Sequence, residues 1–307
     1  MAIATQRDED PYADHAADRL TAAISRAGSP VCVGIDPVVD HLPAALCPTG
    51  GSPEHAVEAL VNFTLGVLDA VAEHVPCVKF QSACFERHRH FGIEALNRLI
   101  VEARQRGLQV ILDAKRGDIG LSAEHYAAAA FDRCQDGQDA RPDWITINSY
   151  FGEDGITPFL REGFGAFALV RTSNPGGDTV QAQRLVAGQT VAESVARMVA
   201  SIGGQALLGR CGYSALGAVV GATKPQEAAA LRELMPQQIL LVPGFGTQGG
   251  GVEDIRPCFA RDGTGAIVTA SRSVIYAFDP ETARWSTAVA DAARLFAEQI
   301  GRAVGMR

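Results

Sequence analysis

The sequence has little basic charge and lacks any long apolar run. Its 307 residues hold 27 Lys and Arg against 35 Asp and Glu, a formal net charge of −8. Binding to a nucleic-acid backbone requires a basic face, so we expect no nucleic-acid partner. A small anionic ligand needs only a local cluster of donors. Because no segment approaches the roughly 20 apolar residues that span a bilayer, we also expect no membrane span.

Paired cysteines and a secretion signal are also lacking. The seven cysteines are scattered, with no CxxC pair and no zinc-ligand spacing. This pattern is typical of reduced thiols and predicts neither a disulfide framework nor a metal site. Residues 1–20 carry acids where a signal peptide would have a basic start and an apolar run. We therefore expect a cytoplasmic protein.

Short apolar runs alternate with amphipathic stretches along most of the chain. The runs are apolar nearly throughout, as in parallel strands covered on both faces. Helical patterns such as residues 54–74 and 94–107 lie between them. Strand starts recur about every 34 residues, the size of one βα unit. The candidate strands are residues 31–35, 77–81, 109–113, 144–148, 167–171, 217–221, 239–243 and 266–270.

This alternation predicts an α/β protein with a single (β/α)8 TIM barrel over residues 1–307 and a core of about 30–303. A doubly wound open sheet is the alternative. Polar residues follow nearly every strand, at the end where barrels build active sites, and favour the barrel. An N-terminal helix within 12–27 and the region 174–216 exceed a minimal barrel. The polar residues are Asp36, Lys79, Asp113, Lys115, Asn148, Thr172, Ser173, Asn174, Thr223, Ser271 and Arg272.

The stretch LDAKRGDIG (112–120) places four charges at the end of a core strand. Residues two apart on a strand share a face, so Asp113 and Lys115 are predicted to project together into the barrel mouth. A buried lysine needs a carboxylate, and Lys79 on the neighbouring strand can join the array. Asp118 lies off the strand, where it could curl back, cap the next helix or serve a neighbouring subunit. The alternative to a catalytic array is an ordinary salt-bridge cluster.

A glycine-rich stretch, LVPGFGTQGG (241–250), follows the seventh strand. Glycines let backbone N–H groups approach an anion, and barrels often bind phosphate in the loops after strands seven and eight. Gln248 can donate through its amide and Arg272 through its guanidinium fork. A plain tight turn would also explain one such loop. Together the loop and the arginine predict a phosphorylated small-molecule ligand.

The ordered motifs GIDP, VKFQ, LDAKRGDIG, RTSNPG, PGFGTQGG and SR resemble those of the orotidine 5′-monophosphate decarboxylase family, in its longer bacterial (type 2) subfamily. The resemblance runs from residue 32 to residue 275. Its central signature, D-x-K-x-x-D, is shared with sister barrels that act on sugar phosphates. The other motifs in this order make the resemblance specific.

The resemblance implies a role for each candidate site residue. Asp36 would bind the ribose hydroxyls, and Ser173 would contact the edge of the pyrimidine. Lys79 would bond to the ribose and would also belong to the charge array. Asp113 would lie beside the substrate carboxylate, and Lys115 would protonate C6. Asp118 and Ile119 would come from the partner subunit of a dimer, and Ser122 would contact the ribose. Gln248 and Arg272 would bind the phosphate through their side chains, and Gly246 and Ser271 would bind it through their backbone groups. The resemblance assigns no role to Arg116, which we interpret as a structural or surface charge.

The activity implied is the cofactor-free, metal-free decarboxylation of orotidine 5′-monophosphate to uridine 5′-monophosphate and CO2, the last step of de novo pyrimidine nucleotide synthesis. A homodimer with shared active sites is implied as well. A magnesium-dependent sister enzyme is one rival interpretation, and a catalytically silent nucleotide-binding barrel is another.

Overall fold

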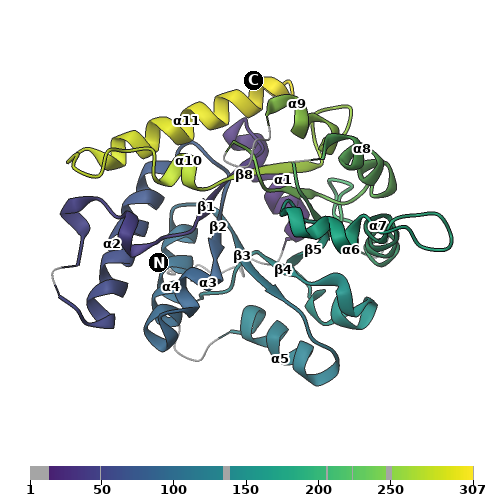
Figure 1. Ribbon diagram of the computed structural model, residues 1–307, viewed down its shortest axis with the longest axis horizontal. Helices are drawn as coiled ribbons and strands as arrows, with labels where there is room; N and C mark the ends of the chain where they lie inside the picture. The colour runs from purple at the N-terminus through teal and green to yellow at the C-terminus, as the bar shows by residue number, and fades with distance from the viewer. Residues whose placement is uncertain are drawn as a thin grey trace, which may run out of the picture.

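A computed structural model describes residues 14–48, 50–133, 139–204, 207–222, 224–246 and 251–306. Its eight strands run parallel and close into a barrel in the order β1-β2-β3-β4-β5-β6-β7-β8, with helices around the outside (Figure 1). The predicted (β/α)8 barrel is therefore confirmed and the open sheet is excluded. Two residues named from the sequence, Thr223 and Gln248, lie outside the described residues.

The strands begin and end within a few residues of the predicted runs. Most of their residues are buried, because the barrel interior covers one face and the helices cover the other. The third strand runs three residues further than expected and carries the charges of LDAKRGDIG within it. The strands are β1 Val31–Ile35, β2 Cys77–Gln81, β3 Gln109–Arg116, β4 Trp144–Ile147, β5 Gly165–Arg171, β6 Leu216–Val220, β7 Leu240–Val242 and β8 Ala266–Ala270.

The helices follow the predicted amphipathic stretches. The predicted stretch 54–74 corresponds to α2, which ends three residues earlier, at Val71, and begins with Ser52 as its N-cap and a proline at the first turn. The helices are α1 Ala16–Ala27, α2 Pro53–Val71, α3 Ser82–Glu86, α4 Arg89–Gln105, α5 Gly120–Phe131, α6 Asp178–Gln181, α7 Val191–Ile202, α8 Pro225–Leu234, α9 Val252–Ile255, α10 Arg272–Ile275 and α11 Trp285–Ala303. Short 3-10 turns are η1 Val39–His41, η2 Ala44–Leu46, η3 Ser149–Phe151, η4 Glu153–Gly155, η5 Thr157–Phe159, η6 Pro175–Gly177 and η8 Arg256–Cys258.

Helix α1 closes the N-terminal end of the barrel. Its apolar residues Leu20 and Ile24 pack in one buried cluster with barrel residues such as Trp144 and Phe167. Arg19 anchors the helix by donating to Asp143, whose carboxylate lies 2.9 Å away. A second, larger cluster fills the layer between the strands and the outer helices. With one end filled by α1, the polar chemistry is left to the opposite end.

The extension at 174–216 contains η6, α6 and α7, as its helical period predicted for residues 189–202. Between α6 and α7 the chain makes a small antiparallel loop in which Arg184 pairs with Thr190 (Figure 1). Thr190 and Glu193 then form a reciprocal capping box at the start of α7. The extension therefore packs on the outside of the barrel, next to the end of β5.

Across the described ranges, no helix combines the length and apolar character that crossing a membrane requires.

Candidate active site

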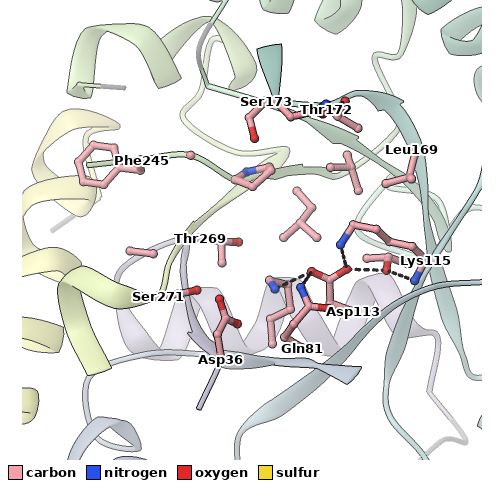
Figure 2. A pocket seen from close by; sticks show the side chains of 18 of the residues that line it. Asp36, Gln81, Asp113, Lys115, Leu169, Thr172, Ser173, Phe245, Thr269 and Ser271 are labelled. Carbon is pink, nitrogen blue, oxygen red and sulfur yellow. Dashed lines mark hydrogen bonds and ion pairs between the residues drawn. The ribbon is translucent and has the colours of Figure 1, made fainter. Parts of the chain in front are cut away.

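A cavity of about 390 Å³ opens at the carboxyl ends of the strands (Figure 2). Seven of the residues predicted from the sequence to form the site line it. They come from β2, β3 and the segments that follow β1, β5 and β8, so the closed barrel brings together residues far apart in the chain. These residues are Asp36, Lys79, Asp113, Lys115, Ser173, Ser271 and Arg272.

Asp113 is the centre of the charge array. Its Oδ2 accepts from Lys79 Nζ at 2.6 Å, and its Oδ1 accepts from Lys115 Nζ at 2.6 Å. Thr146 also donates to Oδ1 at 2.8 Å, and Gln81 to Oδ2 at 3.3 Å. Both carboxylate oxygens are therefore fully engaged, which fixes the two ammonium groups relative to each other.

Burial and charge act in opposite directions on this array. Burial alone would raise the pKa of Asp113, but the ammonium groups of Lys79 and Lys115 hold that pKa well below its usual range. Burial would likewise lower the pKa of Lys79, and the charges of Asp113 and Asp36 more than offset it, so the pKa is raised. Asp113 and Lys79 therefore both stay charged through the neutral range.

The two lysines differ in access to the cavity. Only 7% of the Lys79 side chain is exposed, against 48% for Lys115. Lys79 is thus committed to Asp113, while Lys115 can also contact a bound molecule.

An irregularity at the end of β3 aims Lys115. The pairing of β3 with β4 shifts between Leu112 and Arg116, and Lys115 adopts a left-handed backbone with φ of 46°. Its backbone N–H donates to Thr146 Oγ1 at 3.0 Å. Asp113 and Lys115 do meet as predicted, but through this bulge as well as through simple alternation. Bulges and left-handed residues of this kind recur beside active sites.

Two glycines make room for site residues. A Cβ on Gly34 would lie 1.9 Å from the hydroxyl of Ser271, so only glycine lets β1 pass beneath that serine. A Cβ on Gly221 would lie 2.9 Å from the backbone and Cβ of Ser173. The glycines in GIDP and GAVVG thus set the depth of the cavity wall.

Asp36 reaches the cavity from the turn after β1. Its Oδ1 is buried and accepts no hydrogen bond from the described residues. Tyr276 fixes the backbone of this turn: its hydroxyl accepts from the N–H of Val38 at 2.8 Å and donates to the carbonyl of Asp36 at 3.1 Å. A buried acceptor without a donor favours a hydroxyl-bearing ligand at this point.

Arg116 points away from the cavity, as its interpretation as a structural charge implies. Its guanidinium pairs with Glu86 of α3 and lies 5.5 Å from the ring centre of Tyr126 on α5. Arg116 therefore ties β3 to the helices on either side.

Four further predicted site residues, all within the described ranges, are not brought to the cavity. Asp118, Ile119 and Ser122 lie at the start of α5, where the Oδ1 of Asp118 accepts from the N–H of Ile119 at 2.9 Å. Gly246 is exposed with φ of 77° and does not line the cavity. Gln248 lies outside the described residues.

Several lining residues were missed from the sequence. Gln81 and Thr146 hold Asp113, and Thr269 presents a buried hydroxyl with no partner among the described residues. Leu169 and Phe245 add apolar surface. Alternation could have found Gln81, which shares a face with Lys79, whereas the others depend on register between strands.

The donors of the site do not form a metal cluster. In the described part of the chain, no three His, Cys, Asp or Glu side chains gather in a group that could hold a metal ion.

Comparison with known proteins agrees with this geometry. The model of the orotidine 5′-phosphate decarboxylase / HUMPS family matches residues 29–284. The chain belongs to this family. An orotidine 5′-phosphate decarboxylase of Rhodopirellula baltica is 42% identical over 276 residues, covering 86% of this chain and 89% of the relative. One from Verminephrobacter eiseniae is 43% identical over 266 residues, covering 85% of this chain and 89% of the relative. The solved structure of Leishmania donovani OMP decarboxylase superposes with a TM-score of 0.75 at 27% identity, covering 95% of this chain and 99% of that one.

The matched range, residues 29–284, spans all eight strands of the barrel and contains Lys79, Asp113 and Lys115. The resemblance drawn from the sequence motifs is confirmed at the level of the family.

Proposed function

We propose that this protein decarboxylates orotidine 5′-monophosphate to uridine 5′-monophosphate and CO2, the last step of de novo pyrimidine nucleotide synthesis. The observation that carries the proposal is the buried Asp113 carboxylate held between Lys79 and Lys115 inside a cavity that Arg272 also lines. The cavity size suits a nucleotide-sized molecule. Family membership supplies the substrate class.

The nucleotide is placed by its charges and hydroxyls. In Figure 2, Lys115 lies on the opposite side of the cavity from Ser271 and Phe245. The dianionic phosphate would bind at Arg272, together with the backbone of Ser271 and Gly246 and the amide of Gln248. Asp36 would accept from the ribose hydroxyls and Ser173 would contact the edge of the pyrimidine. C6 then lies toward Lys115.

The chemistry needs a cation at C6. The C6–carboxylate bond breaks, CO2 leaves, and the electron pair remains on C6 as a carbanion with no conjugated sink. The Lys115 ammonium stabilises that charge and gives C6 a proton, and the resulting amine regains a proton from water. The proposed step uses no cofactor.

Asp113 can contribute in two ways. It holds Lys115 at 2.6 Å, which orients the proton. A carboxylate about 4 Å from the substrate carboxylate would also cost on the order of 4 kcal/mol at an effective dielectric of 20, a repulsion that disappears as CO2 departs.

A homodimer with shared sites accounts for the residues that do not reach the cavity. Ile119, Leu121, Tyr150 and Phe151 expose 56%, 68%, 83% and 46% of their surfaces. A Cβ on Gly117 would lie 3.2 Å from the ring of Phe151, so the segment that leads to Asp118 packs against Phe151. An apolar surface of this kind favours a partner subunit, which would carry Asp118, Ile119 and Ser122 into the opposite site.

We also place the enzyme in the cytoplasm, where its thiols stay reduced; the six cysteines in the described ranges are all unpaired.

A spectrophotometric assay with orotidine 5′-monophosphate, with and without EDTA, tests the function. We expect turnover that EDTA leaves unchanged. Loss of turnover with EDTA would favour a magnesium-dependent sister activity, and binding of uridine 5′-monophosphate without any turnover would favour a silent nucleotide-binding barrel.

A further inference from the structure

The cavity wall after β5 is built from three consecutive residues, Thr172, Ser173 and Asn174. Figure 2 shows Thr172 and Ser173 across the cavity from Asp36 and Ser271, on the side where the proposed function places the base. The wall is a loop and its conformation must be imposed by its surroundings. The extension at 174–216 supplies that constraint.

Gln181, at the end of α6, grips the first wall residue. Its Oε1 accepts from the backbone N–H of Thr172 at 2.9 Å, and its Nε2 donates to Thr172 Oγ1 at 2.9 Å. The Thr172 hydroxyl in turn lies 2.7 Å from Asn174 Oδ1. Gln181 thus fixes Thr172 directly, and the Thr172 hydroxyl links it to Asn174 at the other end of the wall.

Arg171 locks α6 in the place from which Gln181 reaches the wall. It is 1% exposed, and its Nε donates to Glu227 Oε2 of α8 at 2.6 Å. Its Nη2 pairs with Asp178 of α6, and its Nη1 donates to Gln181 Oε1 at 3.2 Å. A planar guanidinium that engages two helices and the wall at once defines a single arrangement for all three.

Two further contacts complete this network. Lys224 donates to the second oxygen of Asp178 at 2.7 Å, so α6 is also tied to the start of α8. A Cβ on Gly177 would lie 2.9 Å from Thr172 Oγ1, so the turn between the wall and α6 is packed against the wall itself.

We propose that Gln181 and Arg171 are positioning residues that hold the Thr172–Asn174 wall in register for the pyrimidine base, and that this is the task of the α6 part of the extension. The inference rests on the proposed function for the identity of the base. It predicts that the network governs binding of the base and leaves binding of the ribose phosphate unchanged.

The test compares two ligands that differ by the base, uridine 5′-monophosphate and ribose 5-phosphate, as binders of the full-length protein. Gln181→Leu removes the hydrogen bonds at nearly constant size. We expect uridine 5′-monophosphate to bind about tenfold more weakly, which corresponds to a loss of about 1.4 kcal/mol in binding free energy. Ribose 5-phosphate should bind within about twofold of wild type, which also shows that the variant is folded.

The matched controls lie on the same segment. Gln183→Leu makes the same chemical change two residues away, on an exposed side chain, and should leave both affinities unchanged. Gln181→Glu retains the acceptor for Thr172 and Arg171 and should restore most of the affinity. In a Ser173→Ala background, the penalty of Gln181→Leu should shrink, because the wall residue through which it acts is already gone.

Equal weakening of both ligands, or no weakening of either, would overturn the proposal. Absence of orotidine 5′-monophosphate turnover in the wild-type protein would instead contradict the proposed function, since the two-ligand comparison needs binding alone.

Discussion

At the scale of single residues, the site depends on one carboxylate with two cations. Asp113 engages Lys79 and Lys115 through different oxygens, each at 2.6 Å, and only Lys115 is substantially exposed. The two lysines therefore have different roles: Lys79 compensates the buried charge of Asp113, and Lys115 can contact the ligand.

Replacing Lys115 with Ala should abolish catalysis while retaining nucleotide binding. The carbanion loses its cation and its proton source, so we expect turnover to fall at least about a thousandfold. The loss of orotidylate absorbance measures the rate, with Arg302→Ala, an exposed cation on α11, as the control. Turnover within tenfold of wild type would show that the assignment of Lys115 is wrong.

Arg272→Ala should weaken phosphorylated ligands selectively. A guanidinium–phosphate pair contributes about 1.5–3 kcal/mol, which corresponds to a loss of about 10- to 100-fold in affinity for uridine 5′-monophosphate. Binding of uridine, which has no phosphate, should change little. Parallel titrations of the two ligands check this, and an equal loss for both would rule out a phosphate role.

At the scale of elements, the regular strands carry the site residues, and irregular segments set the direction in which those residues point. The bulge in β3 turns Lys115 toward Asp113, and the α6 segment holds the wall after β5. At the other end of the barrel, α1 is fixed by Asp18, which accepts from the backbone N–H groups of Cys211 and Arg210 at 2.7 and 3.0 Å.

The Asp18 contact should make stability depend on pH. Burial would raise the pKa of Asp18, but hydrogen bonds from Cys211 and Arg210 lower it from 3.8 to about 2. A depressed carboxyl pKa contributes stability above about pH 4 that is lost as pH falls toward 2. Asp18→Asn should therefore lower the free energy of unfolding by about 1–2 kcal/mol at pH 7, with about half of that difference gone at pH 3.

Urea denaturation of Asp18→Asn and wild type across pH 3–7 measures this difference. Asp291→Asn, on an exposed surface pair of α11, serves as the control and should show almost none. A difference for Asp18→Asn that stays constant with pH would contradict the electrostatic explanation.

At the scale of the whole molecule, the barrel was predictable and part of the site was not. Apolar runs of even spacing identify the strands because both faces of a parallel sheet are buried. Motif residues such as Asp36 and Ser271 follow directly from their places after strands. Thr146 and Thr269 could not be found, because their roles depend on which strands become neighbours and in what register. The hold of Gln181 on Thr172 likewise needs coordinates.

The shared-site dimer makes a prediction for the assembled enzyme. Asp118→Ala and Lys115→Ala subunits are each expected to be inactive, and a heterodimer of the two regains one intact site. Random reassortment of equal amounts should restore about a quarter of wild-type activity, because half of the dimers are mixed and each has one working site. Activity after mixing and subunit exchange measures this, and no recovery would place Asp118 outside a shared site.

The position of α1 at the closed end of the barrel determines where a tether or a fused domain can be attached without covering the active site. Met306 packs against the same buried cluster as α1, so both described ends of the chain lie at the closed end, away from the mouth. A tether, a carrier surface or a fused domain joined directly at residue 14 or residue 306 would therefore start at the closed end of the barrel and leave the mouth open to solvent.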